Sequence, residues 1–351
     1  MRKLYIYIII GIASLLWSAC TDVQLCDVSV HPHLAQVSFK FNWGTLDKTK
    51  PDSMYVIVSR PLNTYHDYFS LPSVNSSPVG MKSGEYFMVA CNKDSMVDIV
   101  NLNEFKTDFS NISLEDLALR MKSLKREEVP QLAGMDWIDF SPGYSYMANT
   151  GAFFADVQNY ISIYTGNSAE ISFFPKILTQ NITIRLEIET DNSVQLEEIM
   201  AEIAGIPMDM NPYNGIVNEA NLGKMIYSPD LAKRQDNVST FEGTISVFGL
   251  VAGQDEKAVS GPGVLQIAVL AKSESKKKIF RAGVNISKLI TEAGLLKSSE
   301  SGEGNVKAKE TATLIIDRQL KIKAGEIEKE EEDGVSGWFT NEENGDINVD
   351  I

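Results

Sequence analysis

The sequence has few of the residues on which most enzyme and metal sites depend. Its 351 residues include only three histidines and three cysteines. It contains no Gly-x-Ser-x-Gly turn, no Walker-type phosphate loop and no His-Glu metalloprotease pair, which argues against hydrolases, nucleotide-binding enzymes and zinc proteases of those types. A carboxylate pair for glycoside hydrolysis stays open, because acidic residues abound and their spacing in the fold is not visible. We therefore predict that the chain is not an enzyme and has no metal and no cofactor.

Positive charge is also scarce. The formal net charge is −15, which disfavours nucleic acid and anionic membrane faces as partners. Much of the acidity lies near the C-terminal end, where we predict a solvated loop. A calcium site is the alternative, but the run lacks the alternating ligands and terminal bidentate Glu of an EF-hand. The run consists of Glu326, Glu328, Glu330, Glu331, Glu332 and Asp333, followed by Glu342, Glu343 and Asp346.

Only one long apolar run occurs, at the N-terminal end. Met1-Arg2-Lys3 precedes an uncharged run from residue 4 to 16, which is too short to span a bilayer comfortably and suits a signal peptide. Ser18 and Ala19 then precede Cys20, in the order of a lipobox, although Trp17 stands where leucine is usual. We predict a lipoprotein signal peptide over residues 1–19, a lipid on Cys20 and a lipid-anchor lead over residues 20–34. A lipid chain anchors a protein to a membrane without spanning it.

The other two cysteines are an even pair in an oxidising compartment, where disulfides persist. We therefore predict a disulfide between Cys26 and Cys91. Metal binding with His31 and His33 is the alternative, but two histidines flanking a proline beside one cysteine match no standard zinc spacing. We interpret both histidines as structural.

Hydrophobic periodicity indicates an all-β protein with a few short helices. Val37, Phe39 and Phe41 alternate with polar residues, and the same period of two recurs in the second half of the chain. The predicted strands are 35–43, 54–58, 68–71, 85–91, 96–102, 170–174, 181–189, 240–251, 264–271, 278–284, 311–322 and 346–351.

Three segments favour helix. Ser113 can cap a helix through Asp116, and leucines follow at residues 114, 117, 119 and 124. The segment 194–204 looks partly helical, and 286–293 suits a short helix. The interval between the two β regions is rich in aromatic residues, which we interpret as cover for a core edge rather than a ligand platform. These residues are Trp137, Phe140, Tyr144 and Tyr146.

Short strands, frequent turns and few helices predict two tandem β-sandwich domains. We place the N-terminal domain at 35–167 and the C-terminal domain at 168–351.

Several motifs in this order resemble a known group. Leu25-Cys26-Asp27, His31-Pro32-His33, the strand from Val37 to Trp43, and Cys91-Asn92-Lys93-Asp94 follow the lipobox, and Phe174-Pro175 and Gly345-Asp346-Ile347-Asn348 recur later. The chain resembles the fimbrillin-like lipoproteins of Gram-negative gut and oral anaerobes. Within that group it is similar to a domain of unknown function found beside the minor-fimbrium anchor subunits.

The resemblance implies two transthyretin-like Greek-key β-sandwiches and a structural role in surface pili, as an anchor, accessory or tip subunit. Other pilus subunits would be the partners, bound by β-strand addition, and the lipid on Cys20 would hold the protein at the outer membrane, on the cell surface. It implies no catalytic residues. The alternative is an outer-membrane lipoprotein that binds glycans, with Trp137 or Trp338 stacking on sugar rings.

The group also implies a way to distinguish anchor from stalk. Stalk subunits lose their first strand, and with it their lipid, to an arginine-specific protease. Here Lys48 and Lys50 follow the first strand, but the first arginine after Arg2 is Arg60, beyond the second strand and before Pro61. We therefore predict that the first strand is kept and that the chain is an anchor or accessory subunit.

The same resemblance suggests O-glycosylation of Ser53 and Ser95. Asp52-Ser53-Met54 and Asp94-Ser95-Met96 resemble the Asp-Ser/Thr-apolar signal of these bacteria. A chance tripeptide is the alternative for each.

Overall fold

The computed structural model describes most of the chain after residue 33. The described residues are 34–61, 65–107, 113–132, 145–164, 166–253, 258, 260–274, 276–296, 310–328, 338–339 and 349–350. The predicted signal peptide, Cys20, Cys26, His31 and His33 lie outside them. So do Trp137, Phe140, Tyr144 and the acidic residues of the predicted run from Glu330 to Asp346.

Two sheets share the N-terminal core. One is three-stranded and has β1 in its centre; its order is β10 (Ser168–Phe173), β1 (Leu34–Phe41) and β4 (Val79–Lys82). The other is five-stranded, in the order β11 (Lys176–Ile177), β9 (Phe154–Ile163), β5 (Gly84–Asn92), β2 (Ser53–Ser59) and β3 (His66–Pro72). Both contribute side chains to one buried apolar cluster, which we call the N-terminal core. Burial of this shared face holds the two sheets together.

Two further sheets form the C-terminal part. The first has the order β16 (Asp230–Gln235), β17 (Val238–Val247), β12 (Gln180–Thr190), β20 (Thr311–Ile322) and β22 (Val349–Asp350). The second has the order β21 (Trp338–Phe339), β19 (Lys276–Asn285), β18 (Val264–Ser273), β13 (Val194–Pro207), β15 (Leu222–Tyr227) and β8 (Ser145–Ala148). Their facing side chains belong to the largest buried cluster of the described residues, which is rich in isoleucine and which we call the C-terminal core. This cluster also includes Ile57, Val89 and Cys91, on the face of the five-stranded N-terminal sheet that is turned away from the N-terminal core.

A small sheet and short helices complete the described structure. The small sheet has the order β14 (Asp209–Met210), β7 (Ala118–Met121) and β6 (Val97–Val100). The helices are η1 (Gly44–Thr49), α2 (Leu102–Thr107), η3 (Leu114–Asp116), η4 (Arg126–Glu128), α3 (Ser287–Glu292) and α4 (Ala324–Glu328).

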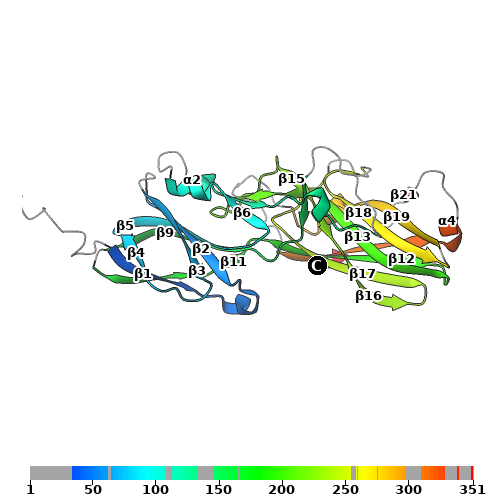
Figure 1. Cartoon of the computed structure of the whole chain (residues 1–351), viewed down its shortest axis with the longest axis horizontal. Coiled ribbons are helices and arrows are strands. Elements are labelled where there is room, and N and C mark those ends of the chain that lie inside the picture. The colour runs from blue at the N-terminus through cyan, green and yellow to red at the C-terminus, as the bar shows by residue number, and fades with distance from the viewer. Residues whose placement is uncertain are drawn as a thin grey trace, which may run out of the picture.

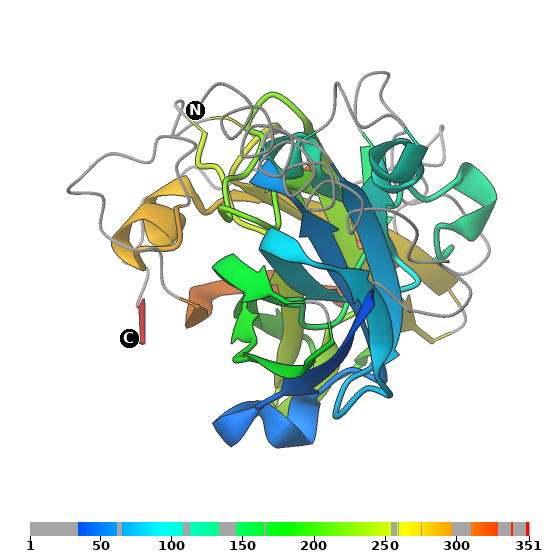
Figure 2. The ribbon, with the colours of Figure 1, turned by 90° about the vertical axis from the view of Figure 1, so that its left-hand side faces the viewer.

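The molecule is elongated, with the two sheet pairs at opposite ends of its long axis (Figure 1). Figure 2 looks along that axis from the N-terminal end, with the blue and cyan strands of the N-terminal sheets nearest the viewer. β10 runs parallel to β1 and leads through β11 into β12, so both strands run toward the C-terminal sheets. Leu34 therefore lies at the end remote from those sheets.

The prediction of a mostly β protein is confirmed. β20 spans the predicted residues 311–322, and α3 confirms the short helix near residue 290. In β12 every second side chain is buried, as the alternation at 181–189 predicts.

The helix predicted from Ser113 is wrong after its first turn. Ser113 and Asp116 do form the expected capping box. The chain then leaves the helix, and Leu117, Leu119 and Met121 alternate into the core as a strand. The buried side chains recur every second residue, as in a strand, and not every third or fourth residue, as in a helix.

The partly helical interpretation of residues 194–204 is also wrong, because this segment is the long strand β13. From Ile199 to Pro207 every residue is buried. A strand covered on both faces shows no alternation, so its sequence lacks the period of two that identifies strands with one solvent face.

The predicted domain boundary falls at the start of β10. This strand pairs with β1 over six residues, from Gln36 with Ser168 to Phe41 with Phe173. It therefore belongs with the N-terminal sheets and not with the C-terminal ones. The division into two domains stays a prediction.

Candidate functional site

The predicted anchor role depends on whether the first strand, β1, is retained, so the surroundings of β1 are the candidate functional site. Ala35, Val37, Phe39 and Phe41 point into the N-terminal core and are at most 5% exposed, with Trp43 following in the same way. Gln36 lies exposed and Lys40 half-buried on the opposite face. The alternation predicted from the sequence therefore sets which face of the strand is buried.

Both edges of β1 are hydrogen-bonded. β10 pairs in parallel along one edge, and β4 pairs antiparallel along the first half of the other. Residues 73–76 continue that second edge: Phe41 N–H donates to Val74 O at 3.0 Å, and Ser76 exchanges bonds with Phe39 at 2.8 and 2.9 Å. β10 and β4 are not neighbours of each other. Removal of β1 would therefore leave a slot with open backbone groups on both sides and an apolar floor.

The loop after β1 carries the lysines but no arginine. Lys48 and Lys50 are exposed in and after η1, and Lys50 pairs with Asp47 at 2.8 Å. Arg60 follows β2, and its guanidinium lies over the rings of Tyr65 and Tyr86, 5.6 and 5.1 Å from their centroids. It also donates to the carbonyl of Ser83. A side chain held in this way is poorly placed to enter a protease pocket.

Cys91 lies near the end of β5 and is fully buried, with a free thiol in the structure. Burial raises the pKa of this thiol to about 12, so it is a poor nucleophile at neutral pH. Its predicted partner Cys26 is outside the described residues, and the disulfide stays a prediction.

The two predicted glycosylation serines lie in different surroundings. Ser95 is exposed in the turn between β5 and β6, where Asp94 Oδ1 accepts the Met96 N–H at 2.6 Å. Ser53 is half-buried at the start of β2 and pairs with Pro72. Only Ser95 presents its side chain from an exposed turn, which suits a modifying enzyme better.

The aromatic residues predicted to cover a core edge are described only at Tyr146. It is buried in β8 and packs in a small cluster with Val129, Leu132 and Ile226. The predicted role is confirmed at this position. Trp338 lies in β21, but its side chain is outside the described structure.

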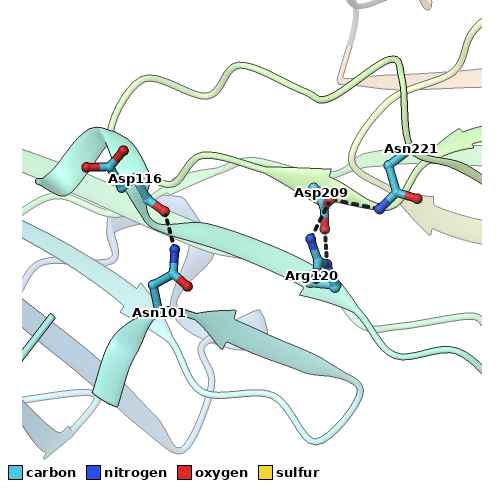
Figure 3. A network of polar contacts seen from close by, with 5 residues as sticks. All are labelled: Asn101, Asp116, Arg120, Asp209 and Asn221. Carbon is cyan, nitrogen blue, oxygen red and sulfur yellow. Dashed lines mark hydrogen bonds and ion pairs between the residues drawn. The ribbon is translucent and has the colours of Figure 1, made fainter. Parts of the chain in front are cut away.

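A polar network that the sequence did not reveal joins β7 to β14 (Figure 3). Arg120 binds Asp209 through two bonds, Nε to Oδ1 at 2.5 Å and Nη2 to Oδ2 at 3.0 Å. Asn221 donates to the same Oδ2 at 2.8 Å. Burial alone would raise the pKa of Asp209, but the bonds from Arg120 and Asn221 outweigh it and hold that pKa below its ordinary value. Arg120 and Asp209 are 89 positions apart in the sequence, so no local pattern could have paired them.

A second unforeseen pair lies on the covered outer face of the C-terminal sheets. Lys224 Nζ is 2.7 Å from Glu202 Oε1, and the side chains are 8% and 2% exposed. Lys224 also lies over the ring of Tyr146, 5.5 Å from its centroid. Burial raises the pKa of Glu202, although Lys224 opposes that shift. Because the two residues sit in β15 and β13, the pair ties neighbouring strands together.

Within the described part of the chain, no cluster of three or more His, Cys, Asp or Glu side chains is placed to hold a metal ion. No helix among the same residues has the length and apolar character needed to cross a membrane.

Comparison with known families finds a match for the N-terminal third of the chain. Residues 19–129 match the family described as a domain of unknown function, DUF5119. No curated protein shows significant sequence similarity to the chain.

Solved structures extend the comparison to most of the chain. A "putative adhesin" from Bacteroides ovatus superposes with a TM-score of 0.51 at 10% identity, over 82% of this chain and 92% of that one. A "putative adhesin" from Bacteroides thetaiotaomicron gives 0.45 at 14% identity, over 83% and 92%. The fimbrial anchor protein Mfa2 from Porphyromonas gingivalis gives 0.42 at 10% identity, over 80% and 90%. The first of these shows a shared fold, and with the DUF5119 match it confirms the predicted resemblance.

Proposed function

We propose that this chain is a lipid-anchored cell-surface protein of the outer membrane, and an anchor or accessory subunit of a fimbrillin-type pilus. It acts as a structural protein and not as an enzyme. The observation that carries the proposal is the position of β1: it supplies every second side chain to the N-terminal core and is bonded along both edges. An arginine-specific protease that cut after β1 would remove this strand. No arginine lies between β1 and Arg60, so we infer that β1 is retained.

The finer architecture is part of the proposal. Each sheet pair is a transthyretin-like Greek-key β-sandwich, and the two stand in tandem. Because β10 pairs with β1, we propose a division after β11 rather than at residue 168, with β8 crossing to the C-terminal six-stranded sheet.

The direction of β1 supports tethering through Cys20. β1 begins at the end of the molecule remote from the C-terminal sheets, and the lead that precedes it would attach the lipid at that same end (Figure 1). The elongated shape would then hold the C-terminal sheets away from the membrane, where another subunit can reach them. With β1 retained, strand addition would use an edge strand or a donated segment rather than the β1 slot.

The test is a deletion strain complemented with single variants. Without the gene, assembled pili should move from the cell surface to the medium, and the wild-type gene should return them to the cells. A Cys20→Ala variant should leave the pili in the medium, whereas a Cys91→Ala variant should restore attachment. Normal pilus attachment in the deletion strain would contradict the anchor role.

Two modifications belong to the proposal. A disulfide from Cys26 to Cys91 would tie the lead to β5 and contribute about 3 to 4 kcal/mol by restricting the unfolded chain. Thiol alkylation of the denatured, unreduced protein should then find no free thiol, and one labelled at Cys91 would contradict the pairing. O-glycosylation should appear as added hexose on Ser95, and on Ser53 to a lesser extent. An intact mass without hexose would contradict it.

The alternative, a glycan-binding lipoprotein that uses Trp137 or Trp338, gains no specific support, because neither side chain is described. Saturable retention on immobilised glycans that is lost in Trp137→Ala or Trp338→Ala would favour it.

A further inference from the structure

β9 contains a bulge, and the fold requires the extra residue of this bulge but not that the residue be a tyrosine. β9 pairs with β5, and the register shifts between Tyr86 and Met88, so that Asn159 and Tyr160 lie together opposite Phe87. Before the bulge Ala155 and Val157 face the large C-terminal cluster, and after it Ile161 and Ile163 face the N-terminal core. The inserted residue therefore returns the two isoleucines to the core. Any residue could make that insertion.

Tyr160 is an unfavourable choice for the inserted position. Its φ is +59°, in the left-handed region that glycine and asparagine adopt readily and bulky residues do not. The other three non-glycine residues with positive φ in the described chain, Asn101, Asp236 and Glu274, all lie in turns. Tyr160 alone is in a strand, and its side chain is 70% exposed. Strain at an aromatic residue that is this exposed points to a function.

The strained tyrosine stands beside a cleft with two more aromatic residues. Its ring meets that of Phe87 edge-on, with centroids 4.8 Å apart and an angle of 65°. Phe87 lines a cleft of about 250 Å³ together with Tyr213, from the loop before β15. Tyr213 is tied back to the bulge, because its hydroxyl lies 3.3 Å from Asn159 Oδ1. Phe87 and Tyr213 thus line the opening, and Tyr160 lies beside it against the ring of Phe87.

Polar groups at the cleft are held in place from several elements. Glu115 and Ser113 line it, and the capping box of η3 fixes that turn. Asn211 fastens the Tyr213 loop to η3: its amide donates to the carbonyls of Glu115 and Leu117 at 2.8 and 2.9 Å, and its Oδ1 accepts the Tyr213 N–H at 2.8 Å. The cleft is therefore preorganised, which lowers the entropic cost of binding.

The chemistry of the cleft matches a sugar. Aromatic faces stack on the apolar face of a pyranose ring, and the Glu115 carboxylate and Ser113 hydroxyl that line the cleft can accept bonds from its hydroxyl groups. Its volume is below the roughly 300 to 1,000 Å³ of sites that enclose drug-sized ligands, so it suits one end of a glycan. Arg60 also lines the cleft, but its guanidinium is held by the Ser83 carbonyl and two tyrosine rings. Glu115 at the cleft and the net charge of −15 therefore favour neutral sugars over acidic ones.

We propose that Phe87, Tyr160 and Tyr213 form a binding site for the terminal residues of a neutral oligosaccharide. This site uses none of the residues of β1, so it is independent of the pilus role and could serve adhesion alongside it.

The experiment is isothermal titration of the purified mature protein with maltohexaose, xylohexaose and lacto-N-tetraose, and with polygalacturonate as an acidic comparison. We expect saturable binding of at least one neutral probe and none of polygalacturonate. Tyr160→Asn should weaken that binding about tenfold or more, while Tyr160→Phe should keep it within about threefold. Tyr164→Asn is the matched control, because Tyr164 is 67% exposed just after β9 but lies beyond the bulge that sets Tyr160 against Phe87.

Thermal melting separates binding from folding. Asparagine tolerates the left-handed conformation, so Tyr160→Asn should keep the melting temperature or raise it by about 2 to 4 °C even as binding is lost. A second variant, Tyr213→Ala, should weaken the same probe without changing Tyr160. Binding of no neutral probe, or equal binding by Tyr160→Asn and the Tyr164→Asn control, would overturn the proposal.

Discussion

β1 and β12 are the same kind of strand in two different situations. Each is central in its sheet, with one parallel and one antiparallel neighbour, and each buries every second side chain. β12 supplies Ile182, Ile184, Leu186 and Ile188 to the C-terminal core, and β1 supplies a comparable set to the N-terminal one. β12, however, lies in the middle of the chain, whereas β1 directly follows the lead. A single cut can therefore remove β1 but not β12.

The difference shows how a tether can be coupled to folding. Of the seventeen residues in the described N-terminal core, five belong to β1 or follow it directly. A cut in the loop after β1 would separate those five side chains, and the predicted lipid, from the rest of the protein. The C-terminal core contains no residue of that segment. If Cys20 carries the proposed lipid, the same cut would remove the lipid and disrupt the N-terminal core.

The largest effect is expected from removing β1. A chain that starts at residue 44 should lose amide-exchange protection in β2 and β5 and keep it in β12 and β18, because only the N-terminal core loses its central strand. A synthetic peptide of residues 34–43 should restore protection, and the same peptide with Phe39→Asp should not. Full protection of β2 and β5 without the peptide would contradict the comparison.

Single substitutions in the two strands should have similar effects. Phe39 and Ile184 are both fully buried. Phe39→Ala should lower the free energy of unfolding by about 3 to 5 kcal/mol, and Ile184→Ala by about 2 to 5 kcal/mol. Urea unfolding measures both. A loss under about 1 kcal/mol for Phe39→Ala would mean that β1 is only loosely held.

The C-terminal sheets contain the buried ion pair between Lys224 and Glu202. Lys224→Met should lower the free energy of unfolding by about 3 to 5 kcal/mol, because it leaves Glu202 buried without its cation. The double variant Lys224→Met with Glu202→Leu should recover most of this loss. A double variant less stable than Lys224→Met alone would show that the pair is stabilising in itself.

Disrupting the polar network of Figure 3 should change the free energy of unfolding least, and by an amount that depends on pH. Arg120→Ala should lower stability at neutral pH by about 1 to 3 kcal/mol, because the buried Asp209 loses its main partner. The folded pKa of Asp209 is below 3.8, so its contribution is present above that pH and is lost as pH falls through the folded value. Unfolding at about pH 7 and about pH 3 should therefore show the difference between variant and wild type shrinking. A constant difference would contradict the assignment.

The strands with one solvent face were predictable from the sequence, and those without one were not. β1, β12 and β20 follow alternation that burial confirms. β13 is buried on both faces, and β9 contains a bulge that breaks its period after Gln158, so neither shows a clean pattern. The capping box at Ser113 is a local signal and was recognised, but the length of the helix after it depends on tertiary packing.

The sites follow the same division. The burial of β1 could be inferred, because it rests on a local pattern, whereas its retention stays a prediction from the order of arginines along the chain. The pairing of Arg120 with Asp209, or the gathering of Phe87, Tyr160 and Tyr213, depends on which strands become neighbours. Nothing in the residues near Tyr160 marks it as strained, since its positive φ arises from register with β5.

The most direct test of the account is the N-terminus of the protein in assembled surface fibres. Fibres are purified from cells, and mass spectrometry identifies the first residue of this chain. The account predicts an acylated Cys20 followed by an intact β1. A new terminus between Gly44 and Ser53, without lipid, would show that β1 is removed and that the chain is a stalk subunit.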